Sequence, residues 1–169
     1  MYYFFRYGPE IQYCIKKKSL AECMEMTSQE SDADGYGALR NSLVGDLTGD
    51  ILEIGAGIGP TFSYYGTEAS VTAIEPNEEL RNAAEETAAA ARIHVLPGEG
   101  EALPFEDASF DAVSASLVLC SVTSQAETLA EFKRVLRPGG STCLLPAWPS
   151  SETSAHLYTF NDFIQKQRT

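Results

Sequence analysis

The sequence of 169 residues has the length of a single domain, and 44% hydrophobic and 21% charged residues are typical of a globular chain. Twelve Lys and Arg residues against 24 Asp and Glu residues give a net charge of −12, which argues against binding along a nucleic-acid backbone. Four cysteines without a C-x-x-C pair, and no apolar run of roughly 20 residues, predict reduced thiols, no metal site, no membrane insertion and a cytoplasmic location.

Residues 1–49 are expected to form a helical segment that caps the domain. Pro9 can open a helix with Ile11 and Cys14 among its apolar positions, and a turn at Gly35-Tyr-Gly37 follows an acidic, Ser-rich stretch. The aromatic start before three lysines leaves a weak contact with a membrane surface open. A solvated helix whose aromatic residues pack on the domain is the interpretation that we favour.

Residues 50–146 alternate short apolar runs with helical stretches. Helices are expected from Glu78 to about Ala91, capped by Asn77, and from Ser124 to about Leu136, with Glu127 completing a capping box. Strands are expected at 51–54, 71–74, 93–96, 111–116 and 141–145. This alternation predicts an α/β fold with a doubly wound, mainly parallel, Rossmann-like sheet.

Residues 147–169 are expected to form a short tail with one helix, from Leu157 to Gln167. Leu157, Phe160 and Ile164 fall on one face of that helix. No clear pair of strands follows the fifth strand, whose outer edge must therefore be covered. The tail helix, a homodimer contact or a truncated chain could each account for that edge.

The segment from Glu53 to Pro60 contains three glycines, Gly55, Gly57 and Gly59, between the first strand and an expected helix. Open α/β sheets bind ligands at such a bend. Pro60 occupies the position of the third glycine of a dinucleotide fingerprint, and a carboxylate at Glu53 would repel a pyrophosphate but suit a cation. The segment therefore predicts a ligand with a positive charge and no phosphate, and it disfavours a nicotinamide-dependent oxidoreductase.

Carboxylates also follow the second and third strands. Glu75 ends the second strand, where it could accept hydrogen bonds from a ribose diol, although a solvated glutamate is the plainer interpretation. After the third strand, Glu99 could accept from an adenine amino group and Gly100 could offer its N–H. Glu101 is expected to face solvent. These positions predict a nucleoside ligand.

Together these motifs resemble the class I S-adenosylmethionine-dependent methyltransferases of the type 11 group. The resemblance covers about 51–145, and its motifs are Leu52-Glu-Ile-Gly-Ala-Gly-Ile-Gly59, Ala73-Ile-Glu-Pro76, Gly98-Glu-Gly-Glu-Ala-Leu-Pro-Phe105, Ser109-Phe-Asp-Ala-Val113 and Phe132-Lys-Arg-Val-Leu-Arg-Pro-Gly-Gly140. It implies S-adenosyl-L-methionine as the cofactor and a small-molecule methyl acceptor. The cofactor-binding residues that it implies are Glu53, Gly55, Ala56, Gly57 and Gly59 at the methionine end, Glu75 and Pro76 at the ribose, Glu99 and Gly100 at the adenine, and Ser116 and Leu117 after the fourth strand.

The chain also departs from that family. Relatives carry Asp and Ala where Glu99 and Gly100 stand, and two more strands, the last antiparallel, usually follow the fifth. The run 117–122 is similar to membrane-associated methyltransferases of alkyl thiols, which have a long apolar N-terminal anchor. Cys120 in this run is expected to be a small core residue, and no catalytic base stands out. A chain that binds the cofactor without activity is the alternative.

Overall fold

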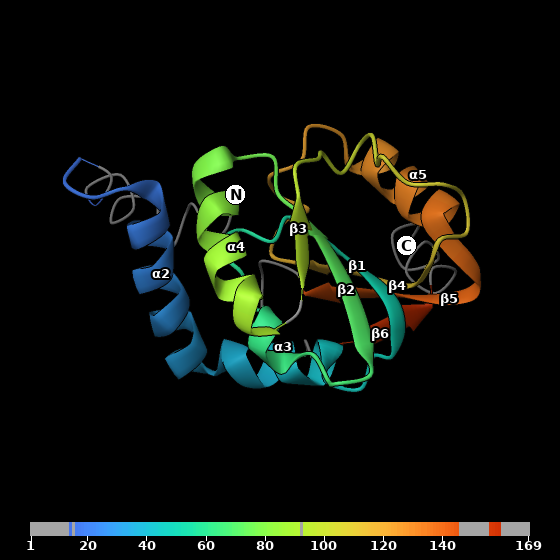
Figure 1. The fold of residues 1–169 in the computed structure, drawn as a ribbon, viewed down its shortest axis with the longest axis horizontal. Helices are drawn as coiled ribbons and strands as arrows, with labels where there is room; N and C mark the ends of the chain where they lie inside the picture. Colours follow the sequence, from blue (N-terminus) through green and yellow to red (C-terminus); the bar gives the residue numbers. More distant parts are fainter. Residues whose placement is uncertain (1–13, 15, 92, 146–155, 160–169) are drawn as a thin grey trace, which may run out of the picture.

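The computed structural model describes residues 14, 16–91, 93–145 and 156–159, which form a six-stranded sheet (Figure 1). The strand order is β3-β2-β1-β4-β5-β6, in which the first five strands are parallel and β6 is antiparallel to β5. The strands are β1 (Gly49–Ile54), β2 (Ala69–Ile74), β3 (His94–Leu96), β4 (Phe110–Ser116), β5 (Leu136–Leu145) and β6 (His156–Thr159). The predicted doubly wound, mainly parallel fold is confirmed.

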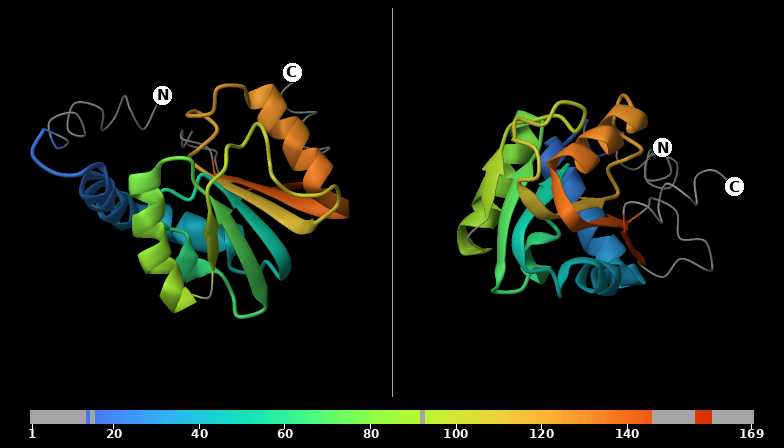
Figure 2. Two further views of the ribbon diagram at one scale, coloured as in Figure 1. Left: turned by 45° about the horizontal axis from the view of Figure 1, so that its top comes forward. Right: turned by 90° about the vertical axis from the view of Figure 1, so that its right-hand side faces the viewer.

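Helices cover both faces of this sheet. They are α2 (Leu20–Ser31), α3 (Gly37–Val44), α4 (Glu78–Ala91) and α5 (Gln125–Val135). Helix α5 lies on one face, whereas α3 and α4 lie on the other, with α2 beside α4 (Figures 1 and 2). A π-helical turn, Asp32–Tyr36, joins α2 to α3 through a kink at Gly35, whose φ is 101°.

The alternation of side chains along β1 builds the core on both faces. Ile51 packs with Ala84 and Ala88 of α4, whereas Leu52 packs with Phe132 of α5 on the opposite face. All five side chains are almost completely buried. Apolar residues at consecutive positions are expected for a central strand that is covered by helices on both sides.

Asn77 and Ser124 cap α4 and α5 as predicted, but the capping box at Ser124 is incomplete, because the Ser124 N–H donates to Glu101 and not to Glu127. The Asn77 side chain accepts the Leu80 N–H at 3.0 Å, and the Ser124 side chain accepts the Glu127 N–H at 3.3 Å. These bonds satisfy backbone N–H groups in the first turns of α4 and α5, which have no partner within the helix.

Three local predictions are wrong. The bend after Gly59 leads only to a short 3₁₀ helix, Phe62–Tyr64, because only six residues lie between Gly59 and Gly66. The strand expected at 141–145 already begins at Leu136, although its pairing with β4 is irregular until Ser141. In the tail, residues 157–159 belong to a strand paired with β5 rather than to a helix, because pairing satisfies the outer edge of β5. Residues 160–167 of the expected helix lie outside the described residues.

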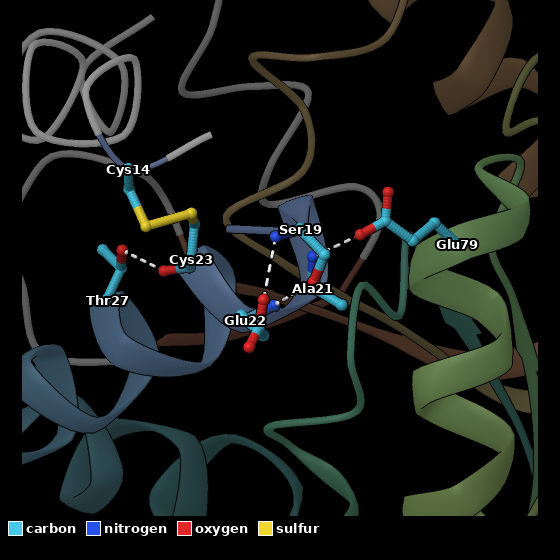
Figure 3. Close-up of a disulfide and its surroundings, with 7 residues drawn as sticks. All are labelled: Cys14, Ser19, Ala21, Glu22, Cys23, Thr27 and Glu79. Carbon is cyan, nitrogen blue, oxygen red and sulfur yellow. Dashed lines mark hydrogen bonds between the residues drawn. A yellow bond between two sulfur atoms is a disulfide. The ribbon is translucent and has the colours of Figure 1, made fainter. Parts of the chain in front are cut away.

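The expectation that all four cysteines are reduced is also wrong. Cys14 and Cys23 form a disulfide, whereas Cys120 and Cys143 are free (Figure 3). Cys14 and Cys23 are nine positions apart and do not form a C-x-x-C motif. Cys23 lies at the end of the first turn of α2, where it comes close to Cys14. The helix expected at Pro9 and the aromatic start lie outside the described residues. Among those that are described, no helix is both long and apolar enough to cross a membrane.

Candidate functional site

A cavity of about 490 Å³ lies where β1, β2 and β4 end. It is formed by the loops that leave these strands, at the edge where parallel α/β sheets bind ligands. The residues predicted from the sequence that line it are Glu53, Gly55, Ala56, Gly57, Glu75, Pro76, Glu99, Gly100, Ser116 and Leu117. Gly59 is the one predicted residue that is not part of the lining.

The three glycines of the loop after β1 have different surroundings. All have positive φ angles, 66° at Gly55, 57° at Gly57 and 83° at Gly59, which other residues rarely adopt. A Cβ atom at Gly55 or Gly59 would collide with Val118 or with the ring of Phe62, whereas one at Gly57 would meet nothing within 4 Å. Gly57 therefore leaves its backbone open to a ligand, and the other two allow close packing.

Glu53 is a buried carboxyl group at the base of the cavity. Glu53 is 2% exposed. The Tyr65 hydroxyl donates a hydrogen bond to Oε2 of Glu53 at 2.8 Å. Burial raises the pKa of Glu53 to about 7, although hydrogen bonds from Tyr65 and Thr61 and the charge of Arg40 lower it in part. A cation in the cavity would favour the ionised form of this group.

Arg40 of α3 lines the same cavity, and sequence reasoning did not identify it. It is 2% exposed and forms an ion pair with Asp32 in the turn before α3. Buried charges are costly unless other charges or ligands compensate them. The site thus presents both a buried carboxyl group, Glu53, and a buried guanidinium, Arg40.

Glu75 is held rigidly just after β2. Its Oε2 accepts the N–H of Gly57 and its Oε1 accepts the N–H of Asn77, both at 2.9 Å. Each carboxylate oxygen has two lone pairs, so both can still accept a bond from a ligand hydroxyl. The carboxylate therefore has a fixed orientation from which it could accept both hydroxyls of a diol.

The two glutamates after β3 differ in their partners. Glu101 accepts the N–H groups of Thr123 and Ser124, and these bonds lower its pKa. Glu99 is exposed at the cavity, and Gly100 is buried beside it, where a Cβ atom would come within 3.1 Å of Thr128 and 3.3 Å of Ile54. Glu101 thus positions the loop before α5, and it does not simply face solvent as expected.

The segment after β4 gives the cavity another wall. Leu117 has a φ of 59°, a strained value for this residue type, and its N–H donates to the Leu145 carbonyl at 2.8 Å. Cys120 was expected in the core, but it is exposed and lines the cavity, because the chain has left the sheet at Leu117. Its sulfur lies 3.4 Å from the Leu117 carbonyl oxygen.

Helix α2 supplies lining residues that the sequence analysis missed. Leu20, Met24 and Ser28 line the cavity from one face of this helix. Ser19 accepts the N–H of Glu22, and the Glu22 side chain accepts the N–H of Ser19 in return. The S-x-x-E pattern of this capping box was the signal that could have located the helix.

Comparison with known proteins defines the class. A family model described as a methyltransferase domain matches residues 52–144, more than half of the chain. The chain therefore belongs to this methyltransferase family, and S-adenosyl-L-methionine is the cofactor of its domain. That ligand carries a sulfonium, a zwitterionic amino acid and a ribose diol. The residues present suit it, because buried Glu53 and Arg40 offer charges of both signs and the fixed carboxylate of Glu75 lies beside the open backbone of Gly57.

Individual relatives cover parts of the chain. Human thiol S-methyltransferase TMT1B is 38% identical over 96 residues, which are 53% of this chain and 39% of that protein. The ubiquinone/menaquinone biosynthesis C-methyltransferase UbiE of Dinoroseobacter shibae is 34% identical over 122 residues, 66% of this chain and 49% of that protein. The chain thus spans half or less of the length of these relatives.

A solved structure of similar fold comes from Methanococcus maripaludis, where it was described as a candidate S-adenosyl-L-methionine-dependent methyltransferase. It shares 22% identity with a TM-score of 0.66, over 74% of this chain and 61% of that one. At this identity the likeness supports the fold alone.

Proposed function

We propose that this protein transfers a methyl group from S-adenosyl-L-methionine to a small-molecule nucleophile, and that the acceptor is a thiol. The observation that carries the proposal is the cavity in which buried Glu53, fixed Glu75 and open Gly57 meet. The bound cofactor would supply an electrophilic methyl group on a sulfonium. The protein then needs mainly to hold donor and acceptor in line, which can contribute several kcal/mol toward the barrier.

Each residue of the cavity has a proposed task in holding the cofactor. Glu53 receives the ammonium group of the methionine end, and Arg40 faces its carboxylate. Glu75 accepts both ribose hydroxyls, and Glu99 accepts the adenine amino group. The remaining contacts are made by backbone and apolar surface at Gly55, Ala56, Gly57, Pro76, Gly100, Ser116 and Leu117. Gly59 does not contact the cofactor, but it allows the loop to pack closely against Phe62.

The proposed acceptor side is apolar. Leu20 and Met24 of α2, Leu80 of α4, and Val118 and Val122 after β4 contribute side chains to the lining. Such walls exclude water and favour an uncharged, apolar acceptor. A thiol suits these surroundings because its ordinary pKa, about 8.5, leaves a reactive fraction of thiolate near neutral pH. The likeness to a thiol S-methyltransferase supports the same acceptor class.

We also propose a division of the chain into a cap of residues 1–49, a cofactor-binding core of 50–146 and a tail of 147–169. The position of α2 on the cavity supports the first part, because a cap that lines the acceptor side would select the acceptor. A homodimer that contacts the tail stays a prediction, as does a cytoplasmic location.

The cofactor and the acceptor can be tested separately. Isothermal titration with S-adenosylmethionine, S-adenosylhomocysteine and NAD should give binding for the first two ligands only. Turnover is then measured on matched panels of alkyl thiols, alcohols, amines and quinols, by mass spectrometry of the methylated products. Methylation of thiols alone would support the proposal. Binding without turnover on any panel would favour the non-catalytic alternative, and methylation of another class would exclude the thiol.

A further inference from the structure

Helix α2 is a wall of the cavity that has little hydrophobic anchorage. Among the residues of α2 whose side chains are described, only Cys23, Thr27 and Ser28 are buried, and Met26 is 48% exposed. The apolar clusters of the described core include side chains from α3, α4 and α5 but none from α2. Its position must therefore depend on other contacts.

At its end the helix continues into the turn Asp32–Tyr36, and a second set of contacts lies at its start (Figure 3). The Ala21 N–H donates to Oε1 of Glu79 in α4 at 2.8 Å, and Ser19 and Glu22 cap the first turn. In addition, the Cys14–Cys23 disulfide ties this turn to the residues that precede it. The disulfide is thus the one covalent tether among the described contacts of α2.

The disulfide can be attacked from one side only. Cys23 is 1% exposed, whereas Cys14 is half-buried. Exposed Lys16, Lys17 and Lys18 begin two positions after Cys14, and the N–H groups of Lys17 and Lys18 donate to its carbonyl. Positive charge beside a disulfide attracts thiolates and stabilises the thiolate that leaves.

We propose that Cys14–Cys23 is a thiol-exchange site at which anionic small thiols release the α2 wall of the cavity. A thiolate attacks the sulfur of Cys14, which forms a mixed disulfide and expels Cys23 as a thiolate. A second thiolate attacks the external sulfur of the mixed disulfide and expels Cys14. The protein disulfide gains two electrons, two external thiols become one disulfide, and the two protons that those thiols lose are taken up by the cysteines.

Reduction of the disulfide should affect the cavity because Cys23 lies among the residues of α2 that line it. Cys23 lies next to Met24 and three residues after Leu20, so a first turn that frays withdraws Leu20 from the wall and loosens Met24 beside it. The effect on ligand affinity rests on the proposed function, but the change in the helix itself does not. Reduction should therefore loosen α2 whether or not the protein methylates anything.

Three measurements on the full chain test this site. In denaturant, the oxidised protein should show two reactive thiols of its four cysteines, and four after dithiothreitol. Hydrogen exchange of 20–31 should become roughly tenfold faster on reduction, while α4 keeps its rate. The affinity for S-adenosylhomocysteine, measured after dithiothreitol is removed under argon, should fall severalfold.

Variants separate the disulfide from general effects of the reductant. Cys14→Ser should resemble the reduced wild type and no longer respond to dithiothreitol, whereas Cys120→Ser should respond like the wild type. At equal thiolate concentration and low salt, the anionic thiol 3-mercaptopropionate should reduce the disulfide faster than cysteamine, which carries an ammonium group. Added salt should decrease the difference between the two rates.

Some results would overturn the proposal. Four reactive thiols in protein purified without reductant would show that the disulfide does not form. An equal response of Cys14→Ser and wild type to dithiothreitol, or unchanged exchange of 20–31 on reduction, would show that it does not hold α2. If the oxidised wild type fails to bind S-adenosylhomocysteine, the cofactor role fails, and hydrogen exchange still decides the role of the disulfide.

Discussion

The substitution Glu53→Gln should stabilise the free protein while it weakens cofactor binding. Burial raises the pKa of Glu53 from 4.5 to about 7, so the folded state holds a proton that the unfolded state releases at lower pH. This difference corresponds to about 3 kcal/mol of folding free energy. The stabilisation is complete below pH 4.5 and disappears as the pH rises through 7, when the buried carboxyl must ionise.

Glutamine avoids this loss because it remains neutral and can still accept the Tyr65 hydroxyl. The free energy of unfolding of the variant, minus that of the wild type, should rise by about 2 to 3 kcal/mol between pH 5 and pH 8. Urea denaturation at several pH values measures this difference, with Glu68→Gln, an exposed carboxyl, as the matched control. A difference that stays constant with pH would refute the assigned burial cost.

Binding should change in the opposite direction. Loss of the proposed contact with the ammonium group should weaken S-adenosylhomocysteine binding about 10- to 150-fold, or about 1.5 to 3 kcal/mol. Wild-type affinity should also fall as the pH drops below 7, because a protonated Glu53 must first lose its proton, and this dependence should disappear in the variant. Calorimetric titration from pH 5.5 to 8 tests both expectations. An unchanged affinity in the variant would remove Glu53 from the cofactor site.

Three further predictions follow from the geometry of the loops and the sheet edge. Glu75→Ala should weaken S-adenosylhomocysteine binding by about 1.5 to 3 kcal/mol in calorimetric titration, and wild-type affinity would contradict its role. Gly57→Val should abolish binding in the same assay. Both Gly57→Val and Gly59→Val strain a backbone of positive φ, but Gly59→Val should lower the melting temperature further because its side chain collides with Phe62; equal melting temperatures would contradict this distinction. Truncation after Pro149 removes β6, so it should lower the melting temperature or cause aggregation, and an equally stable, monodisperse chain in light scattering would show that β5 needs no cover.

The parts of the fold that the sequence predicted correctly are those with local causes. A central parallel strand appears as a short apolar run, and a helix cap appears as a single polar residue at a defined place, such as Asn77 or Ser124. The tail lacks such a signal, because Leu157, Phe160 and Ile164 also suit one helical face. Its pairing with β5 depends on an edge that exists only after the sheet has formed.

Local sequence signals also predicted the cofactor side of the cavity better than the side formed by α2. Apart from Arg40, the residues proposed for the cofactor follow directly from the ends of β1, β2, β3 and β4, and parallel strands necessarily bring those ends together. Arg40 and the α2 residues have no such constraint, because the turn at Gly35 and the first turn of α2 decide where they lie. Substitutions that move α2 should therefore alter the acceptor more strongly than the cofactor, whose affinity falls only severalfold, since the strand ends hold Glu53 and Glu75 independently of this helix. Under the proposed function, selection of the acceptor would thus depend on the wall of the cavity that contributes no side chain to the apolar clusters of the described core.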